Sequence, residues 1–182
     1  MQQEQPAAFN MNQQSTKGNL WEAVAEATRF CSAIEQATDT GRADFIAEML
    51  NCLPRLYLSF LNATPTRLEE EEFAFLTSYV DETLYDTVRG SLAAVMGADD
   101  TYLETFEEDM KYSDTPIAAT VSEGLADIFQ DLYNFAANVR DSEGENIDTA
   151  FAQCRENFES YWSRILCNVM RPLNQIHFSA EE

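Results

Sequence analysis

The stretch IAATVSEGLADIFQDLYNFAANV, residues 117–139, decides the fold class of this chain. Large apolar side chains recur in it every three or four residues, the spacing that places side chains on one face of an α-helix. They are Ile117, Val121, Leu125, Ile128, Leu132, Phe135 and Val139. Phe129 and Tyr133 fall on one flank of this face and widen it. We therefore predict a central helix here, with Pro116 at its first position and Thr115 as its cap.

Helical spacing also marks the amino-terminal half of the chain. A first helix is expected over residues 19–40 and a second over residues 44–62. The second helix contains Pro54, which removes a backbone hydrogen bond and crowds the preceding turn. We therefore predict a kink or a break near Asn51.

The same spacing continues on either side of the central helix. It holds over residues 73–95, either as one helix or as two helices with Asp81 starting the second. The last helix is expected from near Ile147 through Val169, and Pro172 then ends or kinks it.

Two segments lack helical spacing. Residues 2–18 are rich in Gln, Asn and Ser, a composition typical of a flexible tail. Residues 97–115 form an acidic connection, longer than the 12 to 15 residues or so that are common in compact domains. No segment alternates strictly enough to predict a strand. The sequence thus predicts an all-α fold, a single-domain bundle of about five or six helices over residues 19–178, with one long acidic connection and a flexible tail, residues 1–18.

The composition limits the partners of this chain. Its 182 residues include 32 acidic and 11 basic side chains, for a formal net charge of −21 at pH 7. This charge repels a phosphate backbone and an anionic membrane surface, so we expect no nucleic acid and no membrane as partner. The first residues lack a basic segment followed by an apolar run, and no stretch approaches the roughly 20 apolar residues that span a bilayer. We therefore expect a cytoplasmic protein.

The chain lacks the motifs of common enzyme and cofactor sites. Its one histidine, His177, cannot supply paired ring ligands, and its six glycines form no phosphate-binding loop. Its four cysteines stand singly rather than in the close pairs of a zinc site, which predicts free, buried thiols. These observations favour an interaction or regulatory protein over an enzyme, and no cofactor is expected. The partner's identity and the oligomeric state stay open.

Acidic side chains on the predicted central helix are the best candidates for a binding surface. Glu123, Asp127 and Asp131 are spaced four apart, which places them on one side of the helix. The acidic connection adds aromatic residues among acids, a combination that resembles the anchors and rim of a protein interface. Its candidate residues are Tyr102, Phe106, Tyr112 and Asp114. We predict that both together bind a basic protein partner; the alternative is a solvated flank in a very acidic protein.

The run Glu123-Gly124-Leu125-Ala126-Asp127 resembles the second motif, Glu-x-x-Asp, of the all-α nucleotide pyrophosphohydrolases. Its spacing is one residue longer, and Gly124 stands where the acid is expected. The first motif of that family, Glu-x-x-Glu, matches in spacing Glu69 with Glu72, and Glu156 with Glu159. This resemblance implies an alternative function, a magnesium-dependent nucleotide hydrolase. Its Mg²⁺ ligands would be Glu123, Asp127, Glu156 and Glu159.

A further resemblance extends from Trp21 to His177. The residues that carry it are Trp21, Phe30-Cys31, Leu53-Pro54, Tyr102-Leu103-Glu104, Tyr112-Ser113-Asp114, Pro116, Ser122-Glu123, Leu125-Ala126-Asp127, Gln130-Asp131-Leu132, Glu156-Asn157-Phe158-Glu159 and Tyr161-Trp162. On these residues the chain resembles a bacterial family catalogued as domain of unknown function 5063. The resemblance implies a small helical protein of Bacteroides-like bacteria, and it implies no particular activity or functional residue.

Overall fold

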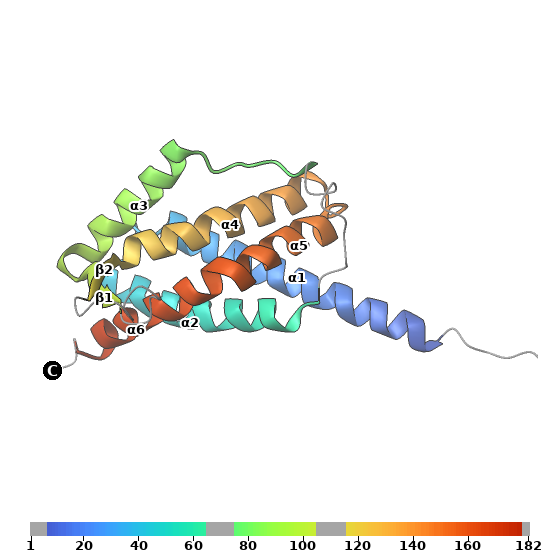
Figure 1. Ribbon diagram of the computed structural model, residues 1–182, viewed down its shortest axis with the longest axis horizontal. Coiled ribbons are helices and arrows are strands. Elements are labelled where there is room, and N and C mark those ends of the chain that lie inside the picture. Colours follow the sequence, from blue (N-terminus) through green and yellow to red (C-terminus); the bar gives the residue numbers. More distant parts are fainter. Residues whose placement is uncertain (1–6, 65–74, 105–115, 180–182) are drawn as a thin grey trace, which may run out of the picture.

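The protein is a bundle of helices with a small two-stranded sheet at one end (Figure 1). The computed structural model describes residues 7–64, 75–104 and 116–179, with side chains from residue 19 onward. In chain order the elements are α1 (Ala7–Glu35), α2 (Arg42–Asn62), α3 (Glu82–Met96), the 3₁₀ helix η2 (Gly97–Asp99), β1 (Thr101–Glu104), β2 (Ile117–Thr120), α4 (Val121–Asp141), α5 (Ile147–Asn157), the π-helical segment η4 (Phe158–Trp162) and α6 (Ser163–Ser179). The predicted helical fold class is confirmed.

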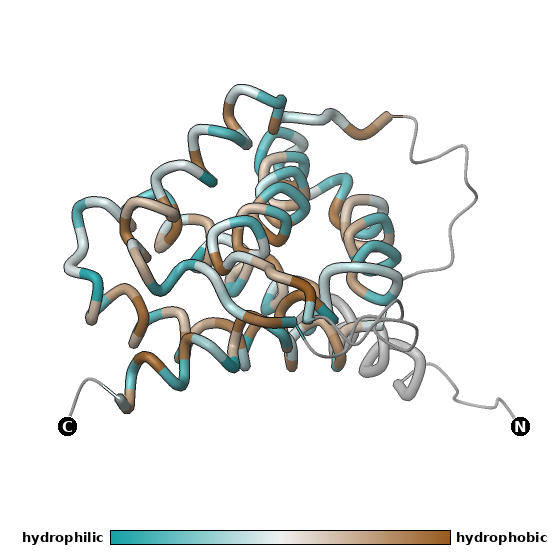
Figure 2. The backbone as a smooth tube through the Cα atoms, turned by 60° about the vertical axis from the view of Figure 1, so that its left-hand side comes forward, coloured by the Kyte–Doolittle hydropathy of each residue, from teal (hydrophilic) through white to brown (hydrophobic). Residues whose placement is uncertain are grey.

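Helix α4 lies at the centre of the bundle and contacts α1, α3, α5 and α6. Hydrophobic and hydrophilic residues follow each other within the turns of the helices (Figure 2), as expected for helices that bury one face and expose the other. An aromatic cluster fills the core beside α4, where the ring centroid of Phe60 lies 4.9 Å from that of Trp162 and 5.3 Å from that of Phe151. Burial of each such side chain stabilises the fold by about 1.5–3 kcal/mol.

The amino terminus of α4 differs from the prediction. The helix begins at Val121, with Thr120 as its cap, rather than at Pro116 with Thr115 as cap. The Thr120 hydroxyl accepts a hydrogen bond from the backbone N–H of Glu123 at 3.3 Å. Asp100 also accepts from the backbone N–H of Ser122 at 2.8 Å, so it caps the same helix from outside it. These side chains satisfy free amide donors of the first turn, which fixes the start of the helix there.

The residues just before α4 form a strand, so the prediction of no strand was wrong. β2 pairs antiparallel with β1, with Thr101 opposite Thr120 and Glu104 opposite Ile117. Each strand has only four residues, too few for alternation to show in the sequence. The described part of the predicted long connection is therefore η2 and β1, and residues 105–115 lie outside the described residues.

Asp81 starts a separate helix, which settles one open alternative of the sequence. Its carboxylate accepts a hydrogen bond from the backbone N–H of Leu84 at 2.8 Å and caps α3. The residues before it, 76–80, form neither a helix nor a strand, so the prediction of helix over this part of residues 73–95 was wrong. We call residues 76–80 the strap, because this segment runs alongside α4 without forming a helix or a strand (Figure 1).

Helix α1 begins at Ala7, upstream of the predicted start at Asn19. The prediction placed residues 1–18 in a tail because they lack an apolar stripe. An apolar stripe indicates that one face of a helix is buried, and a helix can form without one. The first turns of α1 were therefore not predicted. Neither proline ends its helix: α2 continues without a break across Pro54, and α6 continues across Pro172. Of the predicted alternatives at each proline, a kink or an end of the helix, the end is wrong.

Helices α5 and α6 are joined by η4 into one continuous helical stretch. The backbone N–H of Ser163 donates to the carbonyl of Phe158, five residues earlier, as in a π turn. This wider turn has no signature in the spacing of apolar residues, and it was not predicted.

The prediction of buried free thiols is confirmed for three cysteines and wrong for one. Cys31, Cys52 and Cys154 are free and buried, whereas Cys167 is free and exposed. Within the described residues, no helix has the length and apolar character needed to cross a membrane.

Gly124 allows α4 and α6 to approach closely. A Cβ atom at this position would lie 2.6 Å from Val169 Cγ1 and 3.1 Å from Ile165 Cγ2. Both neighbours are β-branched and stiff on a helix, so neither turns aside easily. The glycine is thus required by packing rather than by backbone conformation.

We expect Gly124→Ala to lower the free energy of unfolding by about 1–2 kcal/mol, because overpacking outweighs the gain in helix propensity. Gly90→Ala is the matched control, since a Cβ at Gly90 meets nothing within 4 Å. That variant should gain about 0.5–1 kcal/mol. Urea unfolding followed by circular dichroism measures both, and equal gains in the two variants would contradict the close approach.

Candidate functional site

One side of α4 carries a row of polar residues, most of which form hydrogen bonds to α3, the strap, α5 or η4. The row continues the predicted acidic residues with two asparagines, at spacings of four and three that keep one helix face. Its members are Glu123, Asp127, Asp131, Asn134 and Asn138. We call Glu123, Asp127 and Asp131 the acid flank.

Asp127 is held by two tyrosines from different elements. Tyr85 of α3 donates its hydroxyl hydrogen to Asp127 Oδ1 at 2.7 Å, and Tyr161 of η4 donates to Asp127 Oδ2 at 2.7 Å. Burial and then the hydrogen bond to Asp127 raise the pKa of both tyrosines, so each remains a protonated donor. The carboxylate is therefore oriented by neutral groups.

Asp131 lies one turn further along α4, partly buried against α5. Its Oδ1 accepts a hydrogen bond from the Asn157 side-chain amide at 2.9 Å. Burial raises the pKa of Asp131 to about 6, the hydrogen bond from Asn157 opposes the shift, and the charge of Asp127 adds to it. Asp131 thus changes its charge close to neutral pH, where an ordinary aspartate is already ionised.

The two asparagines of the row hold the strap against α4. Asn134 Oδ1 accepts from the backbone N–H groups of Tyr79 at 2.7 Å and of Val80 at 3.2 Å. Asn138 Oδ1 accepts from the N–H of Thr77 at 2.9 Å, and its amide donates to the carbonyl of Thr77 at 2.8 Å. The side chains of Asn134 and Asn138 therefore satisfy backbone hydrogen-bonding groups of the strap, as the backbone of a neighbouring strand would in a sheet.

The strap, α4 and α5 enclose a cavity of about 160 Å³ beside Asp131. Its polar lining includes Ser78, Asp131, Gln153 and Asn157. Its apolar lining includes Leu76, Phe135 and Ala150. At about 30 Å³ per water molecule, the space suits a few waters or the end of one side chain.

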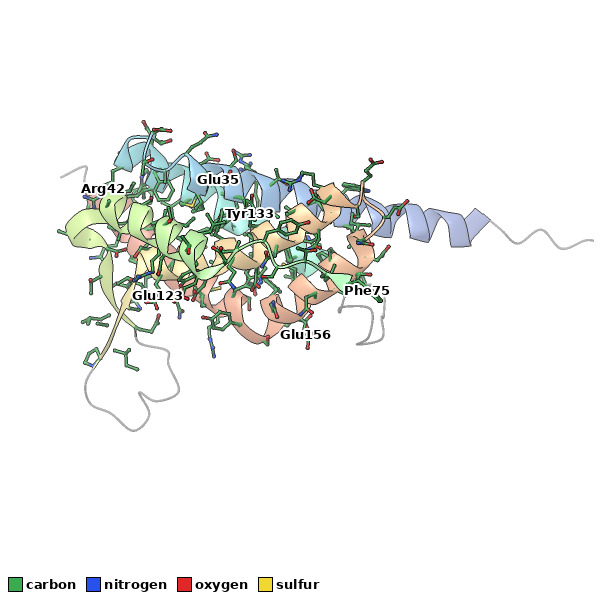
Figure 3. All side chains as sticks on the ribbon, turned by 90° about the horizontal axis from the view of Figure 1, so that it is seen from above. Glu35, Arg42, Phe75, Glu123, Tyr133 and Glu156 are labelled. Atoms are coloured by element: carbon green, nitrogen blue, oxygen red, sulfur yellow. The ribbon has the colours of Figure 1, made fainter. Side chains whose placement is uncertain are left out.

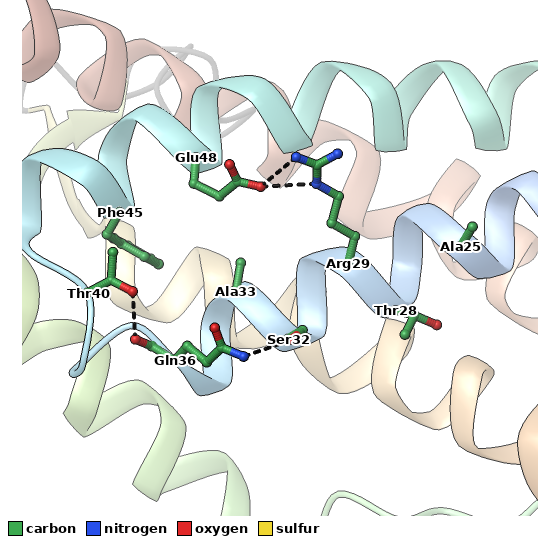
Figure 4. Close-up of a pocket in the computed structure, with 9 residues that line it drawn as sticks. All are labelled: Ala25, Thr28, Arg29, Ser32, Ala33, Gln36, Thr40, Phe45 and Glu48. Carbon is green, nitrogen blue, oxygen red and sulfur yellow. Dashed lines mark hydrogen bonds and ion pairs between the residues drawn. The ribbon is translucent and has the colours of Figure 1, made fainter.

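A larger groove of about 620 Å³ lies between α1 and α2, away from the acid flank (Figure 4). Its charged groups are paired with each other, because Arg29 donates to Glu48 at 3.0 Å. The Gln36 side-chain amide donates to Ser32 Oγ, and the Thr40 hydroxyl donates to the backbone carbonyl of Gln36. This groove therefore has more room but no unpaired charge among its lining residues, whereas the cavity beside Asp131 has one.

Besides Asp127 and Asp131, the structure describes two of the predicted partner-binding residues, Glu123 and Tyr102. Glu123 is exposed in the first turn of α4. Tyr102 lies on β1, opposite Ala119 of β2, and so at the same end of α4 as Glu123. The remaining candidates, Phe106, Tyr112 and Asp114, lie outside the described residues.

The predicted magnesium ligands are not brought together. Glu123 and Glu156 project at different positions along the bundle (Figure 3), and Glu159 forms an ion pair with Arg155 at 2.7 Å. In the described part of the chain, no group of three or more His, Cys, Asp or Glu side chains has the arrangement needed for a metal ion. Magnesium binding stays a prediction without support from this geometry.

Comparisons with known proteins place the chain among relatives. The model of the family described as Domain of unknown function (DUF5063) matches residues 14–179. The chain is also similar to a crystal structure of protein BF1032 from Bacteroides fragilis, a structural genomics target, with 31% sequence identity and a TM-score of 0.75. That match covers 87% of this chain and 91% of the other. No curated protein matches the chain. The family resemblance predicted from the sequence is confirmed.

The role of Asn134 in holding the strap can be tested by hydrogen exchange. We expect Asn134→Ala to remove the acceptor of two backbone amides and to lower the free energy of unfolding by about 1–3 kcal/mol. The amides of Tyr79 and Val80 should then exchange much faster than in the wild type. Gln130→Ala, an exposed change on the same helix, is the control. Unchanged exchange at both amides in Asn134→Ala would contradict this role.

Asp131 should make the stability of the protein depend on pH between about 4 and 6. Its folded pKa is raised above the unfolded value, so the folded state binds the proton more tightly and stability falls as pH rises through this window. Asp131→Asn should not lose stability over this window. Its free energy of unfolding at pH 7 should be about 1–2 kcal/mol higher than that of the wild type. Urea unfolding at pH 4, 5, 6 and 7 measures the difference, and parallel curves for both proteins would contradict the raised pKa.

Proposed function

The chain belongs to the family described as Domain of unknown function (DUF5063), and from this premise we propose that it is an interaction protein that binds a basic protein partner through the acid flank of α4. The proposal combines the charge of the whole chain with the local arrangement of its carboxylates. A net charge of −21 attracts basic proteins over a long range and speeds their encounter. The acid flank then supplies the specific contact.

The observation that carries the proposal is the setting of Asp127. Both of its oxygens accept hydrogen bonds from tyrosine hydroxyls. Among the described residues, no Lys or Arg forms an ion pair with Asp127, Asp131 or Glu123. Neutral donors fix the position of a carboxylate without cancelling its charge. The flank therefore offers negative charge that is oriented in advance, which lowers the cost of binding a cation.

Tyr161 adds aromatic surface to this charge. Its side chain is 46% exposed although its hydroxyl is fixed on Asp127. Tyrosine is enriched among residues that dominate binding energy, and its ring face attracts Lys and Arg side chains. The pair Asp127 and Tyr161 thus matches a partner that presents basic side chains.

The cysteines support a binding role over thiol catalysis. Burial raises the pKa of Cys52 to about 12, and it raises the pKa of Cys31 and Cys154 as well. A reactive cysteine needs a lowered pKa, because the thiolate is the nucleophile. These three thiols therefore act as packing groups.

The proposal is tested by capture of partners from a lysate of the native host. We expect Glu123→Lys combined with Asp127→Asn to reduce the recovery of basic proteins at least tenfold relative to the wild type, because both changes remove charge from the flank. Added salt should weaken the wild-type interaction, since it screens exposed charges. Quantitative mass spectrometry of the captured proteins measures both effects.

The matched control is Glu35→Lys combined with Asp39→Asn. It changes the net charge by the same amount at exposed positions of α1 and the following turn, and Glu35 lies apart from Glu123 (Figure 3). This control should capture basic proteins nearly as well as the wild type. Equal losses in both double variants would mean that net charge alone attracts these proteins, and recovery untouched by salt and by the flank variant would contradict the proposal.

A further inference from the structure

The cavity between the strap, α4 and α5 has the two parts that a lysine side chain needs. Leu76, Phe135 and Ala150 contribute apolar lining, and Asp131 with Asn157 contributes polar lining. A lysine buries its methylene stem along apolar surface while its ammonium group keeps polar contacts. The cavity therefore offers both kinds of surface that this side chain requires.

The size of the cavity suits the same occupant. A cavity of about 150 Å³ can hold a molecule the size of benzene, with six heavy atoms. The cavity here measures about 160 Å³, and a lysine contributes four heavy atoms beyond its Cβ atom. Ser78 and Thr77 are exposed lining residues, so the strap side of the cavity is open to an incoming side chain.

The hydrogen bonds of Asp131 favour an ammonium over a guanidinium group. Asn157 already occupies Asp131 Oδ1, and Oδ2 has no hydrogen-bond donor among the described residues. Arginine binds best when its planar fork meets both carboxylate oxygens, whereas an ammonium is a compact point charge that one oxygen can receive. The side chains of Ser78 and Gln153 line the same space and offer oxygen acceptors for the remaining N–H groups.

We propose that this cavity is a receptor for a single lysine side chain of the basic partner. The inference rests on the proposed function, because it names how that partner is recognised, but the cavity itself can be tested with a small amine. The charge of Asp131 is the element on which binding depends. The titratable and polar groups near Asp131 are Asp127 on α4, Asn157 and the Cys154 thiol on α5, and Tyr161 on η4. The uncharged Ser78 and Thr77 of the strap line the same cavity.

The probe is n-butylammonium, which reproduces the lysine side chain beyond the backbone. We expect it to shift the nuclear magnetic resonance signals of the Asn157 side-chain amide in a saturable way, with a dissociation constant of roughly 0.1–10 mM at pH 7. Binding should weaken as pH falls below about 6, because protonation of Asp131 removes the charge that the ammonium meets. Titrations at constant ionic strength separate this effect from general screening.

Two comparison ligands and a set of variants define the specificity of the cavity for a primary ammonium group. n-Butanol, which has the same length without the charge, should bind at least tenfold more weakly, and n-butylguanidinium should also bind more weakly. Asp131→Asn should lower the affinity for n-butylammonium at least tenfold, and Ser78→Trp should block entry while leaving Asp131 in place. Asp39→Asn is the matched control and should change the affinity less than threefold, since Asp39 is exposed after α1 and does not line the cavity. Circular dichroism confirms that each variant is folded.

The outcomes separate this inference from the proposed function. Equal binding of n-butanol and n-butylammonium, or undiminished binding in Asp131→Asn, would overturn the lysine receptor. If partner capture depends on Glu123 and Asp127 while the amine does not bind, the proposed function stands and this inference falls. If the amine binds as expected but no basic protein is captured, the cavity is a primary-amine site and the proposed function falls.

Discussion

The structure depends on one constraint, which is that α4 is surrounded by other helices on most of its circumference. A helix in that position can bury its apolar face easily, but each polar side chain that becomes buried against a neighbouring element must find a hydrogen-bond partner or lower the stability of the fold. In this protein the partners come from separate parts of the chain. Asn134 and Asn138 bind the strap, Asp131 binds Asn157, and Asp127 binds Tyr85 and Tyr161. The polar row of α4 therefore positions the elements around it as well as forming the candidate site.

The apolar spacing predicted the parts of the fold that are held by burial. It located α2, most of α4 and, as one predicted helix, the stretch from α5 into α6, because each of these helices has an apolar stripe that faces the core. It failed where local hydrogen bonds decide the conformation. The start of α4 is set by Thr120 and Asp100, and the extended form of the strap is set by amides of Asn134 and Asn138, which lie far away in the sequence. No pattern within the strap itself could reveal those contacts.

The candidate site was predicted in the same partial way. Spacing alone identified Glu123, Asp127 and Asp131, because a period of four on a helix is a local property. The continuation of that row to Asn134 and Asn138 was visible in the sequence, and it was the one signal that could have indicated the strap. Tyr85 and Asn157 carry no such signal, because they reach α4 only through packing of other helices. Tyr161 carries no such signal either: it lies in the unpredicted π-helical segment η4, and its hydroxyl donates to Asp127.

That wider turn has a consequence for how members of this family can be compared. A π turn holds one residue more than an α turn, so the helix beyond it keeps its apolar face inward only while that extra residue is present or the turn is remodelled. A relative with a single-residue deletion within residues 158–162 can return to regular α geometry and still bury both apolar faces. It would then lack the outward turn that brings Tyr161 to Asp127. Chain length at this one point is thus a marker, readable from an alignment, for whether a relative retains the tyrosine contact on its central helix.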